Sequence, residues 1–328
     1  MKRNVFPFPM KINDLTTVGS ALKVVRAELV SITDESDLEA SLILEEATGR
    51  NRSALLAFPE KELNLAEQEK ILSLTSRRLE GSPLPYVLGK WEFYGNEFFV
   101  NPSVLIPRPE TELMVDHAAA WLKQWKTGRM QEKLPDSGTL EGLSGNAVAD
   151  IVGFGKDLRW PECADIGTGS GCIAVSLLKL FPALKFTACD ISAAALETAQ
   201  KNAELNGVEE RINFLLSDLD EKLAGPLDLV CANLPYIPKE RCRVLEVAKH
   251  EPLTALDGGR DGFDLYRRLF KGVREKMAAG GLILCELEYS QRNIALREAS
   301  GSFPGAKIQI FNDLAGLPRL LEIQIKKL

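Results

Sequence analysis

Apolar residues return at steps of three and four along residues 15–81, which is the spacing of one face of an α-helix. The sequence therefore predicts a small bundle of helices in this region. Asp37 and Asn64 are suitable helix N-caps, and Gly49 and Gly81 are suitable helix ends. The pattern leaves two interpretations open, a module that stabilises or dimerises the chain and a platform for a partner protein. The apolar residues concerned are Leu22, Val25, Leu29, Leu38, Leu42, Leu44, Leu65, Ile71, Leu74 and Leu79.

Residues 86–100 have a different pattern, with five aromatic side chains around Gly95 and Asn96. Strand-forming residues on both sides of these two predict a β-hairpin that turns there. Residues 126–160 show little periodicity and are rich in Gly, Ser, Asp and Lys, so we expect an inserted surface loop without catalytic residues. The sequence thus predicts a helical domain at 1–82, a hairpin linker at 83–102 and a second domain at 103–328.

After Pro161, short apolar runs alternate with helical segments. This alternation predicts an α/β fold in which a mostly parallel sheet is covered by helices on both faces. Ligands of such sheets bind outside the carboxyl ends of the strands, where the strand order reverses. Strands are expected at 163–166, 185–189, 212–216, 227–232, 282–286, 307–311 and 320–325, and helices at 171–181, 193–206, 264–277 and 291–299.

Composition narrows the classes of protein to which the chain can belong. With 328 residues, of which 45% are hydrophobic, two domains are expected. The absence of a long apolar run, and of a signal-peptide pattern in residues 1–14, predicts a cytoplasmic protein that does not span a membrane. Six cysteines without a Cys-x-x-Cys pair indicate free buried thiols, and two histidines weigh against a zinc site, so no metal is expected. The net charge of -6 weighs against direct binding of nucleic acid.

Residues 165–171 read Asp-Ile-Gly-Thr-Gly-Ser-Gly between a predicted strand and a predicted helix. A dinucleotide-binding fingerprint needs a third glycine or alanine where this chain has Cys172. Here glycines recur at every second residue, a spacing associated with enzymes that use S-adenosylmethionine (SAM). The sequence therefore predicts that backbone close to SAM is supplied by Gly167, Thr168, Gly169, Ser170 and Gly171.

Two further strand ends fit the same ligand. Asp190 lies 19 residues beyond Gly171, where its carboxylate can accept both ribose hydroxyl hydrogens. Its alternative role is N-cap of the helix that begins near Ala193. Asp218 can accept a hydrogen bond from the adenine amino group, with Leu219 against the ring, although a turn aspartate is an equally good interpretation.

Asn233-Leu234-Pro235-Tyr236 follows another apolar strand and supplies chemistry for an acceptor. An amide or exocyclic amine nitrogen is a poor nucleophile because its lone pair is delocalised. Two acceptors, the Asn233 side-chain oxygen and the Leu234 carbonyl, can orient its N–H bonds and leave the lone pair facing a methyl donor. Tyr236 can cover the planar group, and Pro235 stiffens the turn. We therefore expect Asn233, Pro235 and Tyr236 to serve catalysis, and all four residues to contact the substrate.

The chain resembles the family of release-factor glutamine N5-methyltransferases (PrmC/HemK). The resemblance extends almost end to end and rests on RLEGSPLPYVLG at 78–89, Phe93-Tyr94-Gly95, VLIPRPETE at 104–112, the loop at 165–171, Asn233–Tyr236 and HEPLTALDGGRDG at 250–262.

This resemblance implies a class I SAM-dependent methyltransferase with a Rossmann-like, seven-stranded, mostly parallel sheet, preceded by a helical domain that helps to bind the release factor. It implies contacts with SAM at Gly167–Gly171, Asp190, Leu219 and Asn233, and contacts with the glutamine of the Gly-Gly-Gln motif at Asn233–Tyr236. We expect a monomer whose partner is a peptide-chain release factor.

The chain departs from the family pattern at two places. Leu234 stands where the family has a first proline, so we expect a looser turn and reduced turnover, and replacing Leu234 with Pro should maintain or raise turnover. Glu288-Tyr289 follows Glu286 where the family has a glycine. Two alternatives stay open at this point, methylation of an adenine amino group in nucleic acid and a catalytically silent adaptor with a SAM fold.

The remaining motif residues carry open interpretations. Arg108 and Glu112 can order a lid over the cofactor or pair as a surface turn. Glu251 and Pro252 can shape the far wall of the pocket or belong to a structural loop. Phe99 can contact the cofactor or pack within the hairpin.

Overall fold

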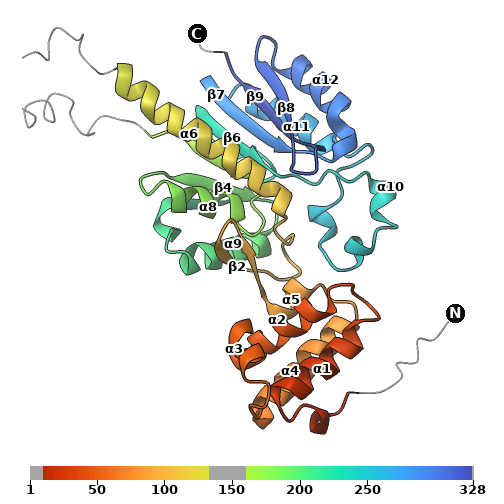
Figure 1. Ribbon diagram of the computed structural model, residues 1–328. Coiled ribbons are helices and arrows are strands. Elements are labelled where there is room, and N and C mark those ends of the chain that lie inside the picture. Colours follow the sequence, from red (N-terminus) through yellow and green to blue (C-terminus); the bar gives the residue numbers. More distant parts are fainter. Residues whose placement is uncertain (1–9, 133–159, 327–328) are drawn as a thin grey trace, which may run out of the picture. The chain divides into compact units, whose positions relative to one another are not determined.

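The computed structural model describes residues 10–132 and 160–326, which fall into two compact units, Met1–Lys90 and Trp91–Leu328 (Figure 1). The division lies inside the predicted hairpin linker. Each unit has its own hydrophobic core, so each can be described by itself.

The first unit is a bundle of helices, as the apolar periodicity predicts. Asn64 caps α4 because its side chain accepts a hydrogen bond from the backbone N–H of Glu67 at 3.0 Å, and Gly49 ends α2 in the left-handed conformation. Asp37 is not an N-cap, since α2 begins at Ser36 and Asp37 lies in its first turn. The elements are η1 (Ile12–Asp14), α1 (Val18–Leu29), α2 (Ser36–Thr48), α3 (Arg52–Ala57), α4 (Leu65–Leu79) and α5 (Leu84–Leu88).

A buried ion pair joins α4 to α2. Arg78 donates through Nε and Nη2 to the two carboxylate oxygens of Glu39, at 2.7 and 3.0 Å. The neighbouring Arg77 donates to the backbone carbonyls of Tyr86 and Val87 in α5. The Arg77 guanidinium therefore holds the backbone of α5 against α4, while Arg78 joins α4 to α2.

The predicted hairpin is shorter than expected. Strands β1 (Lys90–Phe93) and β2 (Asn96–Phe99) turn at Tyr94 and Gly95, one residue earlier than predicted. Both turn residues have positive φ, at 51° and 69°, as a tight two-residue hairpin requires. Residues 86–88, taken from the sequence as strand, belong to helix α5 because Pro85 occupies its first turn and starts it.

The second unit contains a seven-stranded sheet with the order β5-β4-β3-β6-β7-β9-β8. Strand pairs from β5 to β7 are parallel, and β9 runs antiparallel to both β7 and β8. The predicted seven-stranded, mostly parallel sheet is therefore confirmed. Its strands are β3 (Cys163–Ile166), β4 (Phe186–Asp190), β5 (Ile212–Leu216), β6 (Leu227–Ala232), β7 (Met277–Glu286), β8 (Lys307–Asn312) and β9 (Pro318–Gln324).

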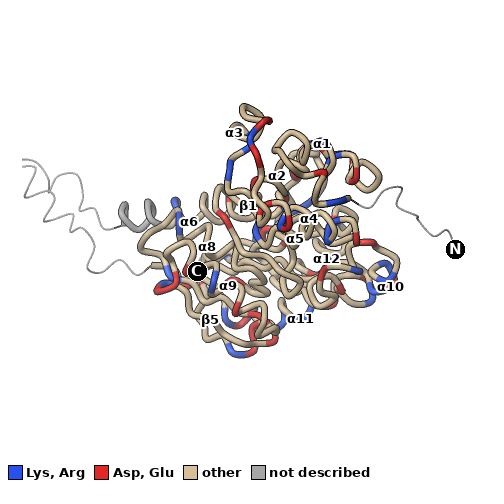
Figure 2. Tube along the Cα trace, turned by 90° about the horizontal axis from the view of Figure 1, so that it is seen from below, with Lys and Arg blue, Asp and Glu red and all other residues tan. Residues whose placement is uncertain are grey.

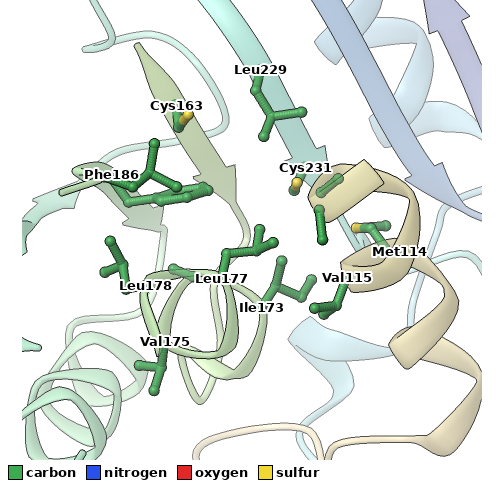
Figure 3. Packing of buried hydrophobic residues seen from close by; sticks show 14 of the residues in the cluster. Met114, Val115, Cys163, Ile173, Val175, Leu177, Leu178, Phe186, Leu229 and Cys231 are labelled. Atoms are coloured by element: carbon green, nitrogen blue, oxygen red, sulfur yellow. The ribbon is translucent and has the colours of Figure 1, made fainter. Parts of the chain in front are cut away.

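Helices cover both faces of this sheet. Successive strand residues point to opposite faces, so Cys163 and Leu229 belong to one hydrophobic cluster, and Ala164 and Val230 belong to another. The first cluster packs against α6 (Glu112–Glu132), α8 (Cys172–Leu180) and α9 (Ala193–Leu205), and Figure 3 shows side chains of α6 and α8 meeting the strands there. The second packs against α11 (Asp264–Val273) and α12 (Arg292–Ser302).

Some predicted boundaries need correction. Helix α6 continues through residues 126–132, which the sequence assigned to the inserted loop; residues 133–159 lie outside the described part of the chain. Helix α11 ends at Val273, and Met277, expected in that helix, begins β7 because the backbone N–H of Leu227 bonds to the Lys276 carbonyl and draws this stretch into the sheet. The short elements are η2 (Pro109–Thr111), η4 (Glu209–Arg211), α10 (Lys239–Cys242), η5 (Glu246–Lys249), η6 (Leu253–Ala255) and η7 (Tyr289–Gln291).

Charged residues of both signs are distributed over the described part of the chain. Figure 2 shows basic and acidic residues interspersed along the traced chain. All six cysteines are buried free thiols, as predicted. Within residues 10–132 and 160–326, no helix combines the length and the apolar character needed to cross a membrane.

Candidate active site

The candidate site lies at the carboxyl ends of β3 and β6, which are neighbours in the sheet. From β3 the chain proceeds to β4 on one side, whereas β6 lies on the other, so the strand order reverses between them. A cavity of about 270 Å³ opens there. Its lining includes the predicted residues Gly167, Thr168, Gly169, Ser170, Asp190, Asp218, Leu219, Asn233, Leu234 and Pro235, whereas the predicted Gly171 is not among the described residues that line it.

The glycine loop after β3 has a backbone that only glycine adopts without strain. Gly167, Gly169 and Gly171 have φ values of 73°, 55° and 80°. A Cβ on Gly167 would lie 2.8 Å from Cδ2 of Leu234, whereas a Cβ on Gly169 would meet nothing within 4 Å. The alternation of glycines is therefore a conformational requirement of the turn, and at Gly167 also a requirement for space.

Asp165 supports this loop from below. Its Oδ2 accepts hydrogen bonds from Thr168 Oγ1 at 2.8 Å and from the Ala174 N–H at 3.3 Å, and its buried Oδ1 has no protein partner. Burial raises the pKa of Asp165 to about 7. The carboxylate thus fixes the loop to the start of α8 at the cost of an incompletely satisfied charge.

Asp190 holds the loop from the next strand. Its Oδ2 accepts from the Gly169 N–H and its Oδ1 from the Ser192 N–H, both at 2.9 Å. The N-cap of α9 is Ser192, which accepts from the Ala195 N–H, so the alternative role of Asp190 as N-cap is wrong. Burial raises the pKa of Asp190. The carboxylate lines the cavity, where it can also accept bonds from a ligand.

Asp218 and Leu219 lie at the end of β5. Asp218 forms an ion pair with Arg268 of α11, with Oδ2 and Nη2 2.7 Å apart. This ion pair engages one carboxylate oxygen of Asp218, the residue for which the sequence left open a hydrogen bond to the adenine amino group. Leu219 has a φ of 49°, a rare value for leucine, and both residues line the cavity.

The turn after β6 is held by partners that are distant in sequence. Asn233 donates through Nδ2 to Thr111 Oγ1 at 3.1 Å. The buried Leu234 donates its N–H to the Tyr266 hydroxyl at 3.2 Å, and that hydroxyl donates to the Glu286 carbonyl at 2.6 Å. The Asn233 side chain and the Leu234 backbone are therefore fixed independently.

Tyr236 lies in a different place from its neighbours. Its hydroxyl donates to Glu286 Oε1 at 3.1 Å, and it is absent from the described residues that line the cavity. The structure thus brings Asn233, Leu234 and Pro235 to the cavity with the glycine loop, and directs the polar end of Tyr236 toward a buried carboxylate.

The stretch at 104–112 contributes residues to which sequence reasoning gave only open roles. Arg108 pairs with Glu251, which also accepts from the Ile106 N–H at 3.2 Å, and Glu112 accepts from the Tyr94 N–H at 2.8 Å. Arg108 and Glu112 therefore have separate partners. Sequence reasoning gave Thr111 no role, and its place between Glu110 and Glu112 was the only signal.

Phe99 belongs to the hairpin and not to the cavity lining among the described residues. Its backbone N–H and carbonyl both bond to the buried side chain of Asn202, at 2.6 and 3.0 Å, and the same amide donates to the Ser170 carbonyl at 2.8 Å. One buried asparagine thus connects β2 to the glycine loop.

Comparison with known proteins agrees with these motifs. Residues 20–89 match the PrmC N-terminal domain, and residues 156–249 match the methyltransferase small domain. Curated proteins named release factor glutamine methyltransferase are similar over most of their length. Those of Chlorobaculum tepidum and Koribacter versatilis are each 35% identical, covering 87% and 92% of this chain and 89% and 95% of theirs. That of Bradyrhizobium diazoefficiens is 33% identical, covering 92% of this chain and 93% of its own. The chain therefore belongs to the release factor glutamine methyltransferase family.

Proposed function

We propose that this protein transfers a methyl group from SAM to the side-chain nitrogen N5 of the glutamine in the Gly-Gly-Gln motif of peptide-chain release factors, and that the cavity at β3 and β6 is the site of transfer. The observation that carries this proposal is the presence of the glycine loop, Asn233 and Leu234 in the lining of one cavity. The loop suits the donor, and the two acceptors suit a primary amide.

The residues of the glycine side fit SAM. Gly167 and Gly169 border the cavity without side chains and with positive φ, which leaves backbone open to a ligand, and the Asp190 carboxylate lines the same cavity, where it can accept from the ribose hydroxyls. When bound, SAM supplies a methyl group on a positively charged sulfur, which a nitrogen lone pair can attack. The cavity has the size of a small-molecule site, at about 270 Å³.

The residues of the acceptor side address the weakness of an amide nitrogen as nucleophile. The Asn233 side-chain oxygen and the Leu234 carbonyl can each accept one N–H of the incoming glutamine, which fixes the plane of its amide. Such fixed dipoles become more favourable as positive charge develops on the nitrogen during transfer. No general base is needed beforehand, since the nitrogen becomes acidic only after it gains the methyl group.

The function is tested by incubating the purified protein with methyl-labelled SAM and a release factor. Label on the glutamine of the Gly-Gly-Gln tryptic peptide is the expected result, and a release factor with that glutamine replaced by glutamate is the matched control. Label found on added nucleic acid would instead indicate adenine methylation. Binding of the release factor without transfer would indicate a silent adaptor.

Three further expectations accompany this proposal. The helical unit contributes to binding of the release factor, the protein acts as a monomer without binding nucleic acid directly, and it works in the cytoplasm, where release factors are found. Binding of the isolated release factor to this protein with and without its residues 1–82 tests the first expectation. Light scattering of the purified protein tests whether it is a monomer. The domain boundaries at residues 82 and 102 stay predictions.

A further inference from the structure

Glu286 ends β7 as a buried carboxylate beside the proposed acceptor turn. Ala232 of β6 is paired in register with Cys285 of β7, so the next residues, Asn233 and Glu286, lie side by side at the end of the sheet. Glu286 is only 2% exposed. A buried carboxylate is costly unless hydrogen-bond donors surround it, so its partners define its role.

Two hydroxyl groups donate to this carboxylate. Thr111 Oγ1 donates to Oε2 at 2.6 Å, and the Tyr236 hydroxyl donates to Oε1 at 3.1 Å. Burial raises the pKa of Tyr236, so its phenol keeps its proton and acts as the donor. Burial also raises the pKa of Glu286, which these two donors and the positive charge of Arg319 oppose. Both carboxylate oxygens are thus engaged as acceptors.

The direction of the first bond determines the orientation of Asn233. Because the Thr111 hydrogen points to Glu286, the lone pairs of Thr111 Oγ1 remain to accept another bond. Asn233 supplies it through Nδ2 at 3.1 Å. An amide that turns its NH2 group toward Thr111 must turn its oxygen the opposite way. The oxygen is the atom that a glutamine N–H needs.

We propose that Glu286 and Thr111 are positioning residues that hold the Asn233 amide in the one flip state able to accept a hydrogen bond from the substrate. This inference rests on the proposed function, since it assigns a role within the same site. Without the hydroxyl at 111, the Asn233 amide can rotate by half a turn and present NH2 to the substrate, where donor faces donor.

The central test compares Thr111→Val with Thr111→Ser. Valine keeps the shape of threonine and removes the hydroxyl, whereas serine keeps the hydroxyl. Removing a buried hydrogen bond to an oriented group corresponds to about 10- to 100-fold. We therefore expect Thr111→Val to lower kcat/KM for the release factor by about that factor, with the dissociation constant for SAM within about twofold of wild type, and Thr111→Ser to restore activity to within about threefold.

A double-mutant cycle separates positioning from general structural damage. If Thr111 acts through Asn233, then Thr111→Val should change residual activity by less than about twofold in an Asn233→Ala background. Equal losses in both backgrounds would overturn the inference. Glu286→Met keeps the approximate length of the side chain and removes both acceptor oxygens, so Thr111 loses the bond that directs its hydrogen, and the variant should resemble Thr111→Val in kinetics.

The outcomes distinguish this inference from the function on which it rests. Wild-type protein that transfers no methyl group to the release factor overturns both. An active wild type with full activity in Thr111→Val overturns the positioning role alone. Far-ultraviolet circular dichroism and the SAM dissociation constant establish folding of each variant, and if Thr111→Val does not fold, Glu286→Met in the same cycle gives the decision.

Discussion

The two loops that border the cavity are built in different ways. The glycine loop after β3 is determined locally, because positive φ values at Gly167, Gly169 and Gly171 and the carboxylate of Asp165, two residues before the first of them, set its shape. The turn after β6 is determined at a distance, by Thr111 from 122 residues earlier and by Tyr266 from 32 residues later. A local motif can be read from sequence, whereas a turn fixed by remote partners requires the fold. Substitutions in the two loops should therefore differ in what they disturb.

Loss of the acceptor group should have the largest effect and should spare the donor side. Asn233→Ala is expected to lower kcat by about 10³-fold, because a preorganised polar contact to the reacting group is lost. The dissociation constant for SAM, measured by calorimetry, should stay within about threefold, since the glycine loop and Asp190 are intact. An equal loss of binding and transfer would show that the two loops do not act separately.

Asp165 makes the glycine side sensitive to pH. Its folded pKa of about 7 exceeds its ordinary value of 3.8, so the folded state holds a proton that the unfolded state releases between these two values. The proton on Asp165 therefore makes the free energy of unfolding highest at acidic pH. This free energy falls as the pH rises toward 7, by an amount on the order of 4 kcal/mol at most. Asp165→Asn cannot ionise at this position and should not lose stability in this way. In urea unfolding from about pH 4 to pH 8, the free energy of unfolding of wild type should therefore fall relative to that of Asp165→Asn as the pH rises. A constant difference would contradict this role.

Two alanine substitutions separate strain from crowding in the glycine loop. Gly169→Ala meets no protein atom within 4 Å, so in the ligand-free protein it should lower the free energy of unfolding only by the cost of a positive φ, about 1–2 kcal/mol. Gly167→Ala adds a contact of 2.8 Å with Leu234, so in urea unfolding it should lower that free energy by about 1 kcal/mol more than Gly169→Ala does. Combining Gly167→Ala with Leu234→Ala should recover part of that difference. Equal free energies of unfolding for the two single variants would remove the role assigned to crowding.

The smallest effect is expected at Leu234. The sequence suggested that proline there maintains or raises turnover, but the structure shows that the Leu234 N–H donates to Tyr266, and proline has no N–H. We now expect Leu234→Pro to lower stability by about 1 kcal/mol and turnover by a few-fold. Tyr266→Phe is the matched variant that removes the same bond from the other side. Thermal unfolding of both, and of the double variant, should give losses that do not add.

The sequence predicted the sheet, its helices and the glycine loop because each follows from local patterns. Apolar alternation determined the strands to within one or two residues for β3, β4, β5 and β6, and glycine spacing located the loop. The partners of the acceptor turn were missed for a physical reason: nothing near Thr111 or Glu286 in sequence reveals that they meet across 175 residues. Helix α11 was drawn too long because Met277 is apolar in either a helix or a strand, and only pairing with β6 decides between them.

Leu234 fills the space that the missing side chain of residue 167 leaves open. The two positions are therefore coupled through one contact: a Cβ at 167 would push the tip of Leu234 aside, and a shorter side chain at 234 would leave room for it. Substitutions at 167 and 234 should accordingly not add in their effects on stability, although the two residues lie on opposite walls of the same cavity and far apart in the sequence.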